Sequence, residues 1–205
     1  MKSKIIGTIC LALGIIVIVT TGTSFAYFSS SVEGQGSIAG SSLEANLNLT
    51  VTPIKETEQL IPLEDNYVGI AVKNNCIDSK GYEVCALYKI TLQNSGDPII
   101  LNGYITEGEE STYTTNNLKG QLFNNELSMS MSNVTTLSNT EGKQYFKVDD
   151  TNFLSTEVTT TNTFYLAIWL TETHTYQDAD YNKDFTGKIA FEAVGGGEIS
   201  ATFSA

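Results

Sequence analysis

Cys76 and Cys85 are the residues best placed for covalent chemistry, because they are the only cysteines that follow residue 26. Their spacing differs from the Cys-x-x-Cys motif of thiol oxidoreductases. With one histidine in the whole chain, the pair does not complete a tetrahedral zinc site. An even number of cysteines in an exported chain predicts a disulfide. In the chain-entropy model, closing a loop of roughly ten residues contributes about 2–3 kcal/mol.

The residues from 178 to 184 resemble a calcium loop, because oxygen ligands occupy every second position. The pattern departs from that of an EF-hand, since Lys183 stands where glycine belongs and Ile189 where the bidentate glutamate belongs. We therefore expect a solvated acidic turn, with a weak calcium site as the alternative and no other metal or cofactor. The candidate calcium ligands are Asp178, Asp180, Asn182 and Asp184.

Catalytic constellations are missing from the sequence. His174 is the one histidine, so a His-Glu-x-x-His helix cannot be assembled, and no Gly-x-Ser-x-Gly turn is present. A serine or cysteine hydrolase would need this histidine beside a free nucleophile. We therefore predict a protein that is not an enzyme.

Residues 1–26 read as a secretory signal peptide. Lys2 and Lys4 precede an apolar run over residues 5–20, which is shorter than the roughly 20 residues of a stable membrane-spanning helix. Ser24 and Ala26 are small residues two apart, so we expect a signal peptidase to cut between Ala26 and Tyr27. The alternative is an uncleaved N-terminal anchor. Cleavage predicts a secreted protein of the extracellular matrix or cell surface, with no membrane attachment afterwards.

The charge of the mature chain limits its partners. Residues 27–205 carry 9 basic and 23 acidic side chains, a formal charge of −14. Such a surface repels phosphate backbones and anionic headgroups, which argues against binding of nucleic acid or of a membrane surface. The mature length suits one domain with a real core.

Alternation of apolar and polar residues dominates the rest of the chain. Residues 27–42 are small, polar and glycine-rich, and residues 43–205 read as one domain built of strands. Strands are predicted at residues 43–51 (ended by Pro53), 68–72, 82–92, 99–105, 127–131, 146–148, 164–170, 185–193 and 199–203. No helical period is apparent after the signal peptide. The fold class is all-β, a single sandwich of jelly-roll or immunoglobulin-like type.

The start of the mature chain resembles one known family. An aromatic pair follows the cleavage site, and a polar run ends in Ile38-Ala39-Gly40 before the alternation of Leu43, Ala45, Leu47 and Leu49. These features resemble the TasA/camelysin family of exported biofilm-matrix fibre proteins, whose signals are handled by a SipW-type signal peptidase. The resemblance implies a jelly-roll fold and fibres built by donor-strand exchange.

Donor-strand exchange assigns a role to residues 27–42. We expect this segment to add to the sheet of another copy or of a related fibre subunit, with Tyr27, Phe28, Val32 and Ile38 filling pockets. A disordered stalk is the alternative for the segment. The alternative for the whole protein is a monomeric surface-binding or adhesion module, in which Tyr104, Tyr113 and Tyr176 contact glycans.

Overall fold

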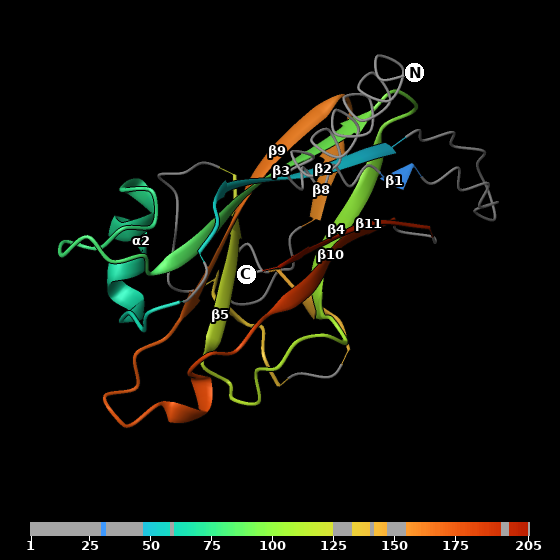
Figure 1. Cartoon of the computed structure of the whole chain (residues 1–205). Coiled ribbons are helices and arrows are strands. Elements are labelled where there is room, and N and C mark those ends of the chain that lie inside the picture. The colour runs from blue at the N-terminus through green and yellow to red at the C-terminus, as the bar shows by residue number, and fades with distance from the viewer. Residues whose placement is uncertain are drawn as a thin grey trace, which may run out of the picture.

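A computed structural model describes residues 30–31, 47–57, 60–124, 133–139, 142–146, 155–193 and 197–204. Within these ranges the chain forms eleven strands, one α-helix and one short 3-10 helix (Figure 1). The elements are β1 (Ser30–Ser31), β2 (Leu47–Lys55), α2 (Asp65–Lys73), β3 (Cys85–Asn94), β4 (Ile99–Glu107), β5 (Leu118–Phe123), β6 (Thr135–Thr136), β7 (Gln144–Tyr145), β8 (Ser155–Val158), β9 (Thr161–Leu170), η2 (Asp178–Asp180), β10 (Thr186–Ala193) and β11 (Glu198–Ser204).

Two antiparallel sheets pack face to face, which confirms the predicted all-β sandwich. The six-stranded sheet has the order β1-β2-β3-β9-β5-β6, and the five-stranded sheet joins β11, β10 and β4, with β7 and β8 both pairing with β4. The chain crosses between the sheets from β3 to β4 to β5, and again from β8 to β9 to β10. Such alternation is typical of jelly-roll and other Greek-key sandwiches.

The predicted central strand at residues 164–170 is confirmed as part of β9, which lies between β3 and β5. On one face, Phe164, Leu166 and Ile168 enter the main core between the sheets. On the other face, Ala167 and Trp169 belong to a second apolar cluster. A strand buried on both faces carries a continuous apolar run instead of an alternating one.

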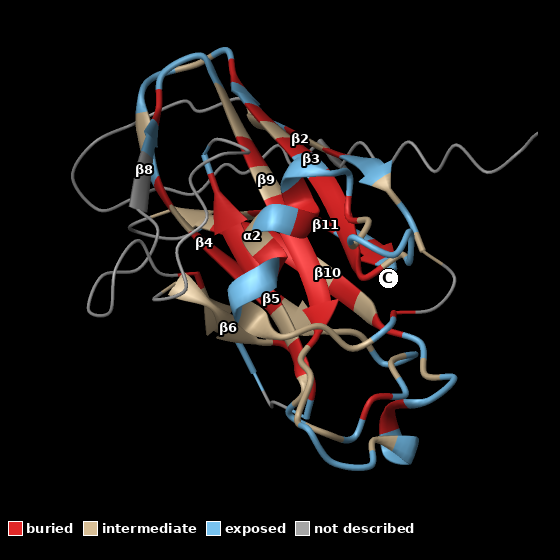
Figure 2. Ribbon diagram, turned by 90° about the vertical axis from the view of Figure 1, so that its left-hand side faces the viewer, coloured by how far each residue is buried: buried red, intermediate tan, exposed pale blue. Residues whose placement is uncertain are grey.

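The second cluster exists because α2 covers the outer face of the six-stranded sheet (Figure 2). The prediction of a strand at residues 68–72 was therefore wrong. Val68, Ala71 and Val72 are buried at the i, i+3, i+4 spacing of a helix, whereas Ile70 is 59% exposed. The valines fit either period, and Ala71 on the same buried face as Val68 fits only the helix.

Pro53 does not end the first long strand, as the sequence suggested, because β2 continues to Lys55. Proline is tolerated in strands near a sheet edge, where its missing N–H faces away from the ladder. The register of β2 on β3 shifts between Pro53 and Lys55, which marks a bulge.

The later predicted strands correspond to β4, β9, β10 and β11. The strand predicted at residues 82–92 begins three residues later, at Cys85. The strand predicted at residues 127–131 lies outside the described residues, as does Val148, while Phe146 is buried next to β7. Among the described residues, no helix is long and apolar enough to cross a membrane.

Candidate functional site

The open side of the sandwich lies where β2 and β11 come close together. Within the described part of the chain, β11 is an edge strand that pairs only with β10. β2 pairs with β3 on one side, and on the other the described strands cover only Asn48 and Leu49, through β1. Both β1 and β2 lie near β11. Unpaired backbone groups on an edge strand are a template for another strand.

A tyrosine joins the two sheets behind this open side. The Tyr88 hydroxyl on β3 donates to the backbone carbonyl of Ser204 on β11, and the Tyr88 ring lies 5.1 Å from that of Phe203. Burial and the nearby Glu56 carboxylate raise the Tyr88 pKa well above its ordinary value. The two sheets are therefore tied together at this point by a neutral phenol.

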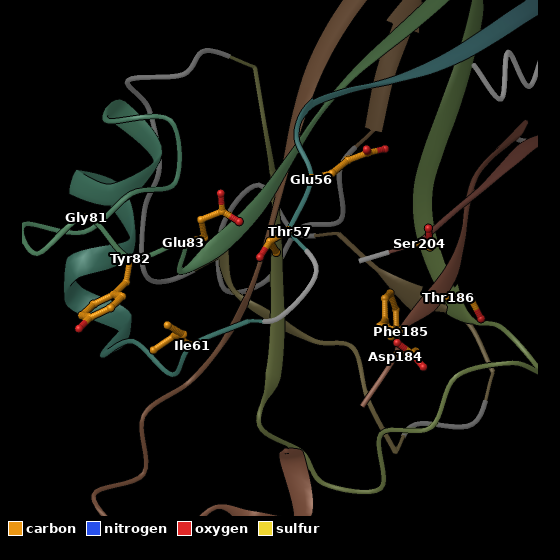
Figure 3. A pocket seen from close by; sticks show the side chains of 10 residues that line it. All are labelled: Glu56, Thr57, Ile61, Gly81, Tyr82, Glu83, Asp184, Phe185, Thr186 and Ser204. Atoms are coloured by element: carbon orange, nitrogen blue, oxygen red, sulfur yellow. The ribbon is translucent and has the colours of Figure 1, made fainter. Parts of the chain in front are cut away.

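A groove of about 1050 Å³ continues from the end of this side (Figure 3). It is bounded by the end of β2, the connection before α2, the loop before β3, and the adjoining ends of β10 and β11. Its lining residues are Glu56, Thr57, Ile61, Gly81, Tyr82, Glu83, Asp184, Phe185, Thr186 and Ser204. One carboxylate of the groove is paired, because Lys55 donates to Glu83 and this bond lowers the Glu83 pKa.

The Cys76–Cys85 disulfide fixes one wall of the groove, and its presence confirms the predicted pairing. It links the residues that follow α2 to the first residue of β3. Within the enclosed loop, Asp78 accepts hydrogen bonds from the backbone N–H groups of Lys80 and Tyr82. The loop that carries Tyr82 and Glu83 is thus held by covalent and hydrogen bonds.

The first residue of α2 is anchored to the sheet. The Trp169 indole N–H donates to the Asp65 carboxylate at 2.7 Å, and the Thr171 hydroxyl donates to the same oxygen. A parallel bridge between Leu63 and Thr171 adds backbone hydrogen bonds at this point. With the disulfide beyond its other end, α2 is fixed at both ends.

The calcium candidates do not converge on one point. Asp180 is buried and accepts hydrogen bonds from the side chains of Thr115, Asn117 (2.7 Å) and Gln177 (3.3 Å). The other three candidates, Asp178, Asn182 and Asp184, are exposed. Among the described residues, no group of three or more His, Cys, Asp or Glu side chains is placed to hold a metal ion. Asp180 instead ties the loop after β9 to the loop before β5.

Two of the three tyrosines expected to contact glycans are buried, which corrects that expectation. Tyr104 lies under the Lys143 ammonium, 4.4 Å from its ring centroid, and its hydroxyl donates to Glu198. Burial and this hydrogen bond raise the Tyr104 pKa to about 12. Burial and the charges of Asp180 and Asp184 raise the Tyr113 pKa to about 12.

Tyr176 is 89% exposed, as the glycan-binding alternative requires. It lies in the loop after β9, near His174, whose side chain is 71% exposed and whose Nε2 lies 3.9 Å from a Glu64 oxygen. His174 has a backbone φ of 56°.

Of the predicted assembly and cleavage residues, Ala26, Tyr27, Phe28, Val32 and Ile38 lie outside the described residues. The groove carboxylates were missed by sequence reasoning, because Glu56, Glu83 and Asp184 come from three separate parts of the chain and share no spacing. Comparison with known proteins adds no relationship: no protein-family model and no curated protein matches this chain.

Proposed function

We propose that this chain is an exported structural subunit, or accessory subunit, of extracellular fibres that assemble by addition of its N-terminal segment to the edge strand β2 of a neighbouring subunit. The neighbour is another copy or a related fibre protein. The sequence resemblance to exported biofilm-matrix fibre proteins supports this role, as do the signal peptide and the disulfide, which suit an oxidising extracellular setting.

The observation that carries the proposal is the pairing of β1 with β2. Ser30 and Ser31, from the segment expected to act as donor, pair antiparallel with Leu49 and Asn48 on the outer side of β2. The segment and this edge are therefore compatible as strand partners within one chain. Exchange of the same pairing between chains keeps its backbone hydrogen bonds and, because it is head-to-tail, extends into a filament.

The proposal is tested with residues 27–205 in a concentration series by size-exclusion chromatography and electron microscopy. Filaments with a regular repeat are expected, favoured by salt and by acidic pH because both reduce repulsion between chains of formal charge −14. Deletion of residues 27–42 is expected to leave a monomer. A deletion variant that assembles normally would refute strand exchange.

A proline pair gives a sharper test, because it removes backbone N–H donors while leaving the sandwich intact. Ser30→Pro with Ser31→Pro is expected to abolish assembly. The matched control is Ser41→Pro with Ser42→Pro, which alters the same segment away from the observed pairing and is expected to assemble. Equal behaviour of the two variants would contradict the assigned register.

The second candidate function is a monomeric binding module, and the exposure of Tyr176 and Tyr181, 89% and 69%, favours it. Their loop is held at its base by the buried Asp180 carboxylate. Rigidly presented tyrosines are common anchors in recognition surfaces. A wild-type chain that stays monomeric but is retained on insoluble polysaccharide, with retention lost in Tyr176→Ser, would favour this function over fibre assembly.

A further inference from the structure

The groove beside the open side is large enough to hold a segment of polypeptide. Addition of a strand to β2 does not require this groove. Its volume of about 1050 Å³ lies at the upper end of the range for small-molecule sites. It is formed where β2 and β11 end and β10 begins, and side chains from these elements and from the loop before β3 line it (Figure 3). An extended peptide fits such a boundary better than a compact ligand does.

The charge of the groove is one-sided. Among the described residues, its lining includes the carboxylates of Glu56, Glu83 and Asp184 and no lysine or arginine. Lys55 pairs with Glu83. Glu56 and Asp184 are exposed and form no ion pair with the described residues. Two carboxylates are therefore available to a cationic ligand.

Apolar side chains also line the groove. Tyr82 and Ile61 are 53% and 39% exposed, and both lie on the α2 side of the groove in Figure 3. On the opposite side, the Thr186 hydroxyl is buried and has no hydrogen-bond partner among the described residues. The exposed Tyr82 ring and Ile61 side chain offer apolar surface on which the apolar side chains of a bound peptide can pack.

We propose that this groove binds an extended, basic segment of a partner protein, in which lysine or arginine side chains alternate with apolar ones. The basic side chains meet Glu56 and Asp184, and the apolar ones pack on Tyr82 and Ile61. The chain's own residues 27–42 do not supply this charge, because they contain Glu33 and no lysine or arginine. The groove thus selects a different protein from the one that strand exchange between copies requires.

The test uses residues 27–205 and a fluorescein-labelled nine-residue peptide in which lysine, valine and threonine alternate, with fluorescence anisotropy as the readout. Versions with glutamine or glutamate in place of lysine are compared. Glu56→Gln with Asp184→Asn removes the two available carboxylates, both of which are exposed. The control, Asp97→Asn with Glu157→Gln, makes the same charge change at the opposite end of the sandwich, where both residues are also exposed.

Two exposed ion pairs predict a loss of affinity of about fivefold for the groove variant and almost none for the control. Tyr82→Ala is expected to weaken binding as well, and without dependence on salt. Equal losses of affinity in the groove and control variants would show that peptide binding depends only on the net charge of the protein, which would overturn the proposal. Equal binding of the glutamine peptide, or no binding of the lysine peptide at millimolar concentration, would also overturn it. None of these results bears on filament formation by the peptide-free protein, so the two proposals can fail separately.

Discussion

Breaking the Cys76–Cys85 disulfide should lower the free energy of unfolding by an amount that depends on the length of the loop it closes. The cysteines are nine residues apart, and the chain-entropy relation then gives about 2.6 kcal/mol at 25 °C. Both cysteines are also fully buried in the second apolar cluster with Trp169. Replacement of both by alanine therefore loses about 1 kcal/mol more through packing.

Urea unfolding followed by Trp169 fluorescence measures both quantities, because Trp169 is the single tryptophan and is fully buried next to α2. Wild-type protein with reductant isolates the loss of the cross-link, and the Cys76→Ala, Cys85→Ala variant adds the loss of packing. Amide hydrogen exchange is expected to rise most in α2, which the disulfide tethers to β3. The reasoning is refuted if reduction changes the free energy of unfolding by less than about 1 kcal/mol, or if α2 is no more affected than β10.

Three further predictions concern single side chains. Gly187→Ala should destabilise the fold by about 1–3 kcal/mol in urea unfolding, because its Cβ would lie 2.7 Å from the Phe203 ring and 2.9 Å from the Phe185 ring. Asp180→Asn should cost about 2 kcal/mol, since an amide cannot accept all the hydrogen bonds made to this buried carboxylate; a change below about 0.5 kcal/mol would contradict that role. Because the folded-state pKa of Tyr104 is raised to about 12, its contribution is complete below pH 10 and is lost as the pH rises from about 10 to 12. Tyr104→Phe should flatten the fall in the free energy of unfolding over that interval, and an unchanged slope would count against it.

The strands that could be predicted from the sequence are those in which each face has the same surroundings along its whole length. β10 and β11 alternate because one face meets the main core and the other is more exposed, and β9 is apolar throughout because both faces are covered. Period and composition report these environments directly. The disulfide was predictable because Cys76 and Cys85 are the only cysteines among residues 27–205.

The helix α2 was missed because its apolar residues fit two periods over nine residues. Its stability comes from packing on β3 and β9 and from the hydrogen bonds that Trp169 and Thr171 make to Asp65. Both residues lie about a hundred positions further along the chain, so no local pattern contains them. Tertiary contacts commonly decide the structure of short segments of this kind.

The burial of Tyr104 was equally hidden from local reasoning. It stands on the outer face of β4, a position that alternation predicts to be exposed, but β7 pairs beside it with Tyr145 opposite Tyr104, and the Lys143 ammonium lies over the Tyr104 ring. Lys143 also pairs with Glu192, and this bond lowers the Glu192 pKa. The burial of Tyr104 thus depends on contacts with residues about forty positions further along the chain, which the sequence of β4 alone does not reveal.

The protection of β2 against unwanted pairing is uneven, and this bears on the proposed assembly. The end of β2 nearest the groove contains Pro53, the bulge that follows it and Lys55. Each of these features discourages addition of another strand. The first half of β2 has none of them. It is this half, at Asn48 and Leu49, that β1 covers within the same chain.

An edge left unprotected by its own residues needs a strand to cover it, and the only described strand that does so comes from the segment expected to be exchanged. Self-pairing in the monomer and pairing between subunits would then compete for one short stretch of backbone, which makes assembly depend on protein concentration and on the integrity of residues 27–42.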